Sequence, residues 1–190
     1  MRTNRMNRVC LAAALAGLIA APTAEAATRT RPPVAELSAD LNGDGVPDRV
    51  VMSGEDDEVD VTVYLSEGGR LPDKPTLHKQ AVGWKGAMAG TEPSMSATPR
   101  GSLILVFQND SVGRDRWRQQ LTVAVRNNAL VVAGYTYTAR DTLDPKNGFT
   151  CDVNLLSGKG QRNGKPFTVP TTPLPLADWN DTTIPPECAF

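Results

Sequence analysis

Val59-Asp60-Val61-Thr62-Val63-Tyr64-Leu65 decides the fold class, because apolar and polar side chains alternate along it without interruption. Alternation with a period of two is typical of a β-strand that has one buried face. No segment shows a sustained helical period, and 16 glycines and 15 prolines interrupt the chain. We therefore predict one all-β domain with little helix, built as a compact antiparallel β-meander, a sandwich or propeller-blade-like sheets. Further strands are predicted at residues 49–53, 76–82, 102–108, 121–125, 129–138 and 151–156.

Two segments lack a clear strand pattern. Residues 83–101 are rich in Gly, Met, Ser, Thr and Pro, and we expect a long irregular connection there. Residues 166–186 contain six prolines, so we expect this part to wrap the surface without regular pairing.

Asn127-Asn128 favours a two-residue hairpin turn between two of the predicted strands, because asparagine tolerates positive φ. A turn of that length fixes the register of the flanking strands. The predicted pairs are Arg126 with Ala129, Val125 with Leu130, Val123 with Val132, and Leu121 with Gly134.

In this register the two faces of the hairpin differ. One is apolar and should face the core, and it carries Trp117, Leu121, Val123 and Val125. The other is a candidate binding face formed by Arg116, Arg118, Gln120, Tyr135 and Tyr137. Guanidinium groups over phenol rings stabilise by about 0.5–1 kcal/mol when exposed, and such a ridge can grip an acidic partner or a glycan. The alternative is a solvated face on which arginine stems shield the tyrosines.

The segment Asp40-Leu41-Asn42-Gly43-Asp44-Gly45-Val46-Pro47-Asp48 has the composition of a calcium loop. It spaces oxygen-bearing side chains along a turn, with Gly45 where a chain wrapping an ion must bend. Ca²⁺ takes six to eight oxygen ligands, which fits this set. An EF-hand loop carries an acid at its twelfth position. Counted from Asp40, that position is Val51, so the loop is not an EF-hand. The predicted ligands are Asp40, Asn42, Asp44 and Asp48 with the Val46 carbonyl.

The stretch from Leu41 to Val51, followed by Val61–Leu65, resembles an FG-GAP/VCBS-type repeat, present here in a single copy. In that family a D-x-N-x-D-G-x-x-D loop binds calcium and leads directly into a strand. The segments Trp117–Thr122 and Cys151–Gly160 resemble parts of small uncharacterised exported bacterial proteins. The resemblances imply a bound calcium ion and a bacterial envelope setting.

Residues 1–26 are predicted to be a secretory signal peptide. Arg2, Arg5 and Arg8 precede an apolar run that is too short to span a bilayer, and Ala24-Glu25-Ala26 supplies a cleavage site. We expect a loosely ordered leader at residues 27–35 and the all-β domain at residues 36–190. Removing the signal takes the net charge from −1 to −3, which gives no reason to expect nucleic-acid binding. No later segment is apolar enough to span a membrane, and the predicted location is periplasmic or secreted.

Cys151 and Cys188 are the cysteines that remain after the signal is removed. A pair of cysteines in an exported protein predicts a disulfide, whereas a redox-active pair would need a CxxC-like spacing. The bond would anchor the proline-rich C-terminal segment.

Catalytic patterns are weak in this sequence. His78 is the only histidine, and no nucleophile elbow or phosphate-binding loop accompanies it. The acidic run Glu55–Glu58 is predicted to be a solvated hairpin tip, with a weak cation site as the alternative.

We therefore expect a non-catalytic, calcium-binding module of the cell envelope whose partner is an envelope protein or a glycan. The alternatives are an envelope carbohydrate hydrolase, or an inhibitor that inserts a loop such as Lys159–Lys165 into a partner enzyme.

Overall fold

A computed structural model describes residues 31–189, which form one compact unit of two antiparallel sheets. The predicted signal peptide lies outside the described residues. In both sheets almost every strand pairs with its neighbours in the sequence, as in a β-meander. The predicted all-β class is confirmed, and the only helical segments in residues 31–189 are short 3₁₀ turns near the C-terminus.

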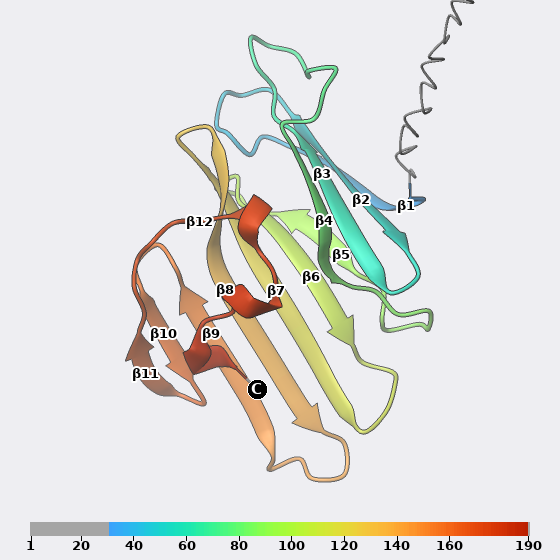
Figure 1. Ribbon diagram of the computed structural model, residues 1–190, viewed down its shortest axis with the longest axis vertical. Helices are drawn as coiled ribbons and strands as arrows, with labels where there is room; N and C mark the ends of the chain where they lie inside the picture. The colour runs from blue at the N-terminus through green and yellow to red at the C-terminus, as the bar shows by residue number, and fades with distance from the viewer. Residues whose placement is uncertain (1–30, 190) are drawn as a thin grey trace, which may run out of the picture. The chain divides into compact units, whose positions relative to one another are not determined.

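The N-terminal sheet has the order β1-β2-β3-β4 (Figure 1). Its strands are β1 (Pro33–Ala39), β2 (Asp48–Glu55), β3 (Glu58–Tyr64) and β4 (Leu77–Trp84). β3 contains the alternating stretch, and its valines are fully buried. β1 begins at Pro33, so the last residues of the predicted leader belong to the sheet.

The C-terminal sheet has the order β11-β10-β9-β8-β7-β6-β5, and β12 pairs with the beginning of β8. Its strands are β5 (Ser94–Ala97), β6 (Leu103–Asn109), β7 (Asp115–Arg126), β8 (Ala129–Asp141), β9 (Gly148–Asn154), β10 (Lys159–Arg162), β11 (Lys165–Thr168) and β12 (Leu174–Pro175). The 3₁₀ turns η1 (Leu176–Asp178), η2 (Asp181–Thr183) and η3 (Pro186–Cys188) follow β12. The expectation of an irregular segment at residues 83–101 was wrong for Ser94–Ala97, which form strand β5. The segment Lys159–Lys165, considered above as an inserting loop, belongs to the β10–β11 hairpin.

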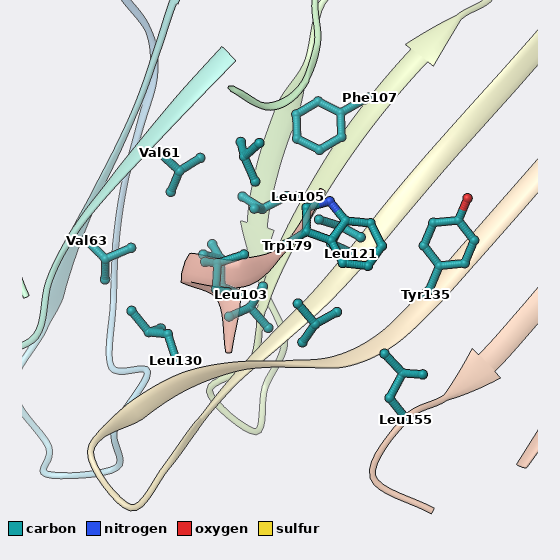
Figure 2. Packing of buried hydrophobic residues seen from close by; sticks show 14 of the residues in the cluster. Val61, Val63, Leu103, Leu105, Phe107, Leu121, Leu130, Tyr135, Leu155 and Trp179 are labelled. Atoms are coloured by element: carbon teal, nitrogen blue, oxygen red, sulfur yellow. The ribbon is translucent and has the colours of Figure 1, made fainter. Parts of the chain in front are cut away.

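The core lies between the two sheets. Val61 and Val63 of the N-terminal sheet face Leu103, Leu105 and Phe107 of β6 in Figure 2. Buried aliphatic and aromatic side chains of this kind each stabilise the fold by about 1.5–3 kcal/mol relative to their exposed state. In Figure 1 the C-terminal turns lie over β7, β8 and β9, beside the N-terminal sheet. The C-terminal sheet is thus covered in part by the N-terminal sheet and in part by the C-terminal turns, and these two contact each other between β4 and η1.

The predicted disulfide is confirmed. Cys151 of β9 and Cys188 of η3 are bonded, their Cα atoms are 5.4 Å apart, and both residues are buried. Arg162 adds to this anchorage, since its guanidinium donates to the Glu187 carbonyl at 3.0 Å. The C-terminal turns are therefore fixed against the sheet. Within residues 31–189 the structure contains no helix with the length and hydrophobicity needed to cross a bilayer.

Candidate functional site: an aromatic groove between the sheets

A groove of about 730 Å³ lies where the N-terminal sheet, strands β7 and β8, and the C-terminal turns meet. This volume is within the range of about 300–1,000 Å³ that is typical of small-molecule sites. The groove is lined by Asp57, Glu58, Ala81, Val82, Gly83, Trp84, Trp117, Gln119, Tyr135, Tyr137, Trp179, Asn180, Asp181, Ile184, Cys188 and Ala189.

The three tryptophans of the chain and two of its three tyrosines line this groove. Their rings form a continuous series of contacts. The ring centroids are 5.4 Å apart for Trp84 and Trp117, 6.3 Å for Trp117 and Tyr137, 6.5 Å for Tyr137 and Tyr135, and 5.7 Å for Tyr135 and Trp179. Pairs at these distances stabilise one another by about 0.5–1.5 kcal/mol beyond their burial. The aromatic series therefore joins the N-terminal sheet, the C-terminal sheet and the C-terminal turns.

The rings differ in exposure along the series. Tyr135 and Trp179 are 2% and 1% exposed and form the floor, where Figure 2 shows them side by side among the core residues. Trp84, Trp117 and Tyr137 are only partly buried, so they present apolar ring surface to the groove. Burial raises the pKa of Tyr135 to about 12, against a smaller opposing effect of a hydrogen bond with Gln119. Burial also raises the pKa of Tyr137, so both phenols stay neutral at physiological pH.

The rim of the groove is acidic. Asp57 and Glu58 come from the β2–β3 hairpin tip, and Asp181 comes from η2. All three are exposed, and the described lining contains no lysine, arginine or histidine. Arg31 reaches the rim from outside, where its guanidinium contacts Glu58 at 2.7 Å and Asp60 at 2.8 Å. The predicted hairpin tip is confirmed, and it faces this groove.

A bulge in β4 places Trp84 at the groove. Val61 pairs with Lys79 and Val59 pairs with Gly83, so Gln80, Ala81 and Val82 all lie opposite Asp60. The additional residues bring Trp84 opposite Glu58; with regular pairing Val82 would stand there.

Gly83 allows the close packing next to Trp84. A Cβ atom at Gly83 would lie 2.5 Å from the Phe107 ring, a distance that real contacts do not reach. Glycine is therefore required for β4 to pack against β6 at this point.

The predicted placement of the arginines and tyrosines on one face of the β7–β8 hairpin was wrong. The first pairs agree with the predicted register as far as Val123 with Val132, but Thr122 then pairs with Gly134 and Leu121 with Tyr135. A β-bulge at Ala133 causes the shift, since a bulged strand contributes one unpaired residue. The bulge lies where the partner of β8 changes from β12 to β9.

The shift separates the residues that had been assigned to one face. Tyr135 and Tyr137 join Trp117 and Gln119 on the groove side. Arg116, Arg118 and Gln120 remain together on the other face, with Thr136, Thr138 and Arg140 as their partners. The predicted apolar face is confirmed for Leu121 and Val123, which are buried, and for Trp117 and Val125, which are partly buried.

The predicted calcium loop connects β1 to β2 through hydrogen bonds to its own backbone. Asp40 accepts from the N–H groups of Gly43 and Gly45 at 2.7 and 2.9 Å. Asn42 accepts from Asp44 N–H, and Asp44 accepts from Val46 N–H at 2.7 Å. This last bond is the main cause of the lowered pKa of Asp44.

Asp48 and Ser66 join the loop to the end of β3. Asp48 is fully buried, and its two oxygens accept from the N–H groups of Leu41 and Ser66 at 2.6 and 2.7 Å. The Ser66 hydroxyl donates to Asp44 at 2.9 Å and lies 3.4 Å from the Val46 carbonyl oxygen. Among the described residues no three Asp, Glu, His or Cys side chains form a metal-binding group. Sequence reasoning missed Ser66, because only the fold brings it to the loop.

The titratable groups that line the groove are carboxylates and phenols. The described lining of the groove contains no histidine, serine, threonine or free thiol. His78 is on β4 outside this lining, with its ring 2.9 Å from the Thr62 hydroxyl of β3. The groove therefore presents ring faces, neutral phenols and carboxylates.

Comparisons with family models, with curated proteins and with solved structures gave no significant match.

Proposed function

We propose that this protein is a non-catalytic binding module of the cell envelope, and that its ligand occupies the aromatic groove. The observation that carries the proposal is the gathering of Trp84, Trp117 and Trp179 with Tyr135 and Tyr137 around one open groove. Partly exposed aromatic rings beside a few polar groups are typical of ligand sites. A purely structural cluster would be expected to close over its rings, since exposed aromatic surface is unfavourable in water.

A periplasmic or secreted location is part of this proposal. The Cys151–Cys188 disulfide supports it, because such bonds persist in oxidising compartments. The disulfide also fixes the turns that carry Trp179 and Asp181, so one wall of the groove would depend on that environment.

Calcium binding at the loop of residues 40–48 is a second, independent part of the proposal. It is supported by the donor set: Asp40, Asn42 and Asp44 have exposed or half-exposed oxygens within a few residues, and Ser66 adds a hydroxyl. Carboxylate, amide and hydroxyl oxygens are hard ligands of the kind that Ca²⁺ prefers. The ion would stiffen the β1–β2 connection, and Asp48 would hold the loop against Ser66 from the buried side.

Intrinsic tryptophan fluorescence tests the groove directly, because every tryptophan of the chain lines it. The protein is titrated with soluble glycans, short peptides and small organic cations and anions, and binding is confirmed by calorimetry. We expect one ligand class to change the emission saturably and to lose its affinity in Trp117→Leu. Tyr64→Leu is the matched control, since Tyr64 lies on β3 outside the groove lining. The absence of saturable binding by every class would contradict the proposal.

A further inference from the structure

The charged side chains that line the groove are all acidic, while Arg31 and Lys85 lie beside the hairpin tip outside the lining. Three carboxylates line the groove, at Asp57, Glu58 and Asp181, and no cationic side chain is among the described lining residues. Glu58 shares the Arg31 guanidinium with Asp60. Asp57 and Asp181 form no ion pair within residues 31–189. Two carboxylates are thus available to a ligand.

These carboxylates stand on separate elements, and the aromatic rings lie in the same groove. Asp57 is in the two-residue turn between β2 and β3, whereas Asp181 begins η2. The negative field extends to the floor, since Asp181 adds to the rise in the pKa of Tyr135. The charge of Asp115 likewise adds to the rise in the pKa of Tyr137. The faces of the tryptophan rings add negative electrostatic potential of their own, because the ring quadrupole is negative above the ring plane.

We propose that the groove binds a small organic cation with an alkylated ammonium head, held over the partly exposed rings of Trp84 and Trp117 and balanced by the rim carboxylates. This inference rests on the proposed function and adds the chemical class of the ligand. An ammonium within about 6 Å of an aromatic centroid is attracted by the ring, and indole is the strongest partner. Alkyl groups on the nitrogen favour this site over water, because they bury apolar surface against the rings while the charge is retained.

The groove disfavours the other charge classes. An anionic ligand would meet three carboxylates with no cationic partner among the described lining residues. A neutral glycan could stack on the rings, but it would leave the charge of Asp57 and Asp181 uncompensated. Charge complementarity therefore selects the cation.

The test compares benzyltrimethylammonium and choline with the uncharged carbon analogue of choline, in which a tert-butyl group replaces the trimethylammonium group. Binding is followed by tryptophan emission and by calorimetry at low and moderate salt. We expect the cations to bind and the carbon analogue to bind roughly tenfold more weakly or worse, since only the charge differs. Trp117→Leu should lose most of the affinity.

The double variant Asp57→Asn with Asp181→Asn isolates the rim. It should weaken cation binding several-fold and flatten its salt dependence while the melting temperature stays within about one degree, because these side chains are exposed. Glu67→Gln with Asp73→Asn is the control, because it removes the same charge from exposed positions outside the lining and should leave affinity unchanged.

Four outcomes would overturn the inference. Equal affinity for choline and its carbon analogue would show that charge does not matter. Cation binding that survives Trp117→Leu unchanged would place the ligand elsewhere. Saturable binding of neutral glycans without cation binding would contradict the inference about the cation but leave the proposed binding function standing. The absence of binding by every ligand class would contradict both the inference and the proposed function.

Discussion

The buried carboxylate of Asp60 accepts a hydrogen bond from the backbone N–H of Ala81 at 2.9 Å. Ala81 is at the β4 bulge and has a φ of 49°, a left-handed conformation that is unfavourable for alanine. The same carboxylate oxygen accepts from Arg31 at 2.8 Å. Asp60 therefore holds both the bulge that places Trp84 and the arginine that reaches the groove rim.

Asp60→Ala should destabilise the protein by about 2 kcal/mol, because it removes hydrogen bonds to a charged group in a buried position. Urea unfolding followed by far-UV circular dichroism measures the loss. Asp73→Ala, which changes an exposed acid, is the control and should stay within about 0.5 kcal/mol of the wild type. A loss of the same small size for Asp60→Ala would show that the bulge does not need this carboxylate.

Ala81→Gly should stabilise the fold by about 0.5–1 kcal/mol, because relief of the left-handed strain outweighs the greater freedom of glycine in the unfolded chain. The midpoint of urea unfolding should rise with an unchanged slope. Ala97→Gly in β5 is a suitable comparison, since its φ is not positive and the substitution should destabilise. A fall in stability for both variants would contradict the assignment of strain to Ala81.

Reduction of the Cys151–Cys188 bond should cost about 3–4 kcal/mol in stability, as chain-entropy arithmetic gives for a separation of 37 residues. Cys188→Ser should show the same loss by thermal melting. Because Cys188 lines the groove, its loss should also weaken ligand binding at temperatures where the protein is still folded. Free-thiol titration of the oxidised protein provides the check, and two reactive thiols in residues 31–189 would contradict the bond.

Protonation of Asp141 should contribute to the loss of stability at acid pH. Its hydrogen bonds with Arg114 lower its pKa from 3.8 to about 2, and the N–H groups of Leu143 and Asp144 assist. Since the folded-state pKa is the lower one, this group stabilises the fold above pH 3.8, and the contribution disappears as the pH falls through 2. Between pH 3.8 and pH 2 the denaturation midpoint should fall less steeply with decreasing pH for Asp141→Asn than for the wild type. An identical slope would show that Asp141 is not the cause.

Calcium should raise the melting temperature if the loop of residues 40–48 binds it. Binding to the folded state alone adds about 2.7 kcal/mol at a hundredfold excess over Kd. Asp44→Ala should abolish the calcium dependence, and Mg²⁺ should substitute poorly because it requires near-octahedral geometry. Asp56→Ala at the hairpin tip is the charge-matched control. Identical melting with Ca²⁺ and with chelator would show that the hydrogen bonds of Asp40 and Asp48 are sufficient for the turn.

The strands with strong local patterns could be predicted from the sequence, and those defined by their partners could not. The valines of β3 alternate, and Asn127-Asn128 forms the hairpin turn with both residues at positive φ. In contrast, β5 and β12 are short, and their pairing depends on β6 and β8. The only local signal of the bulge at Ala133 is the neighbouring Gly134, since a glycine within a strand often marks a bulge. The bulge placed Tyr135 and Tyr137 on the opposite face from the one predicted.

The groove could not be predicted because its parts are far apart in the chain. Trp84, Trp117 and Trp179 come from β4, β7 and the C-terminal turns, and no spacing relates them. The loop of residues 40–48 was visible in the sequence as a cluster of oxygen side chains. Its hydrogen-bond partner Ser66 was not visible, since the contact forms only when the end of β3 reaches the loop.

The meander topology has a consequence for the order in which the chain folds. Each strand of the N-terminal sheet pairs with its sequence neighbours, and contacts of such short separation form early. The groove, however, needs Trp179, Asp181 and Cys188, which lie at the end of the chain and pack against strands β8 and β9. We therefore expect that the two sheets can assemble before the proposed binding groove is complete. Ligand binding would then report that folding is finished, and oxidation of Cys188 would fix the C-terminal turns in place.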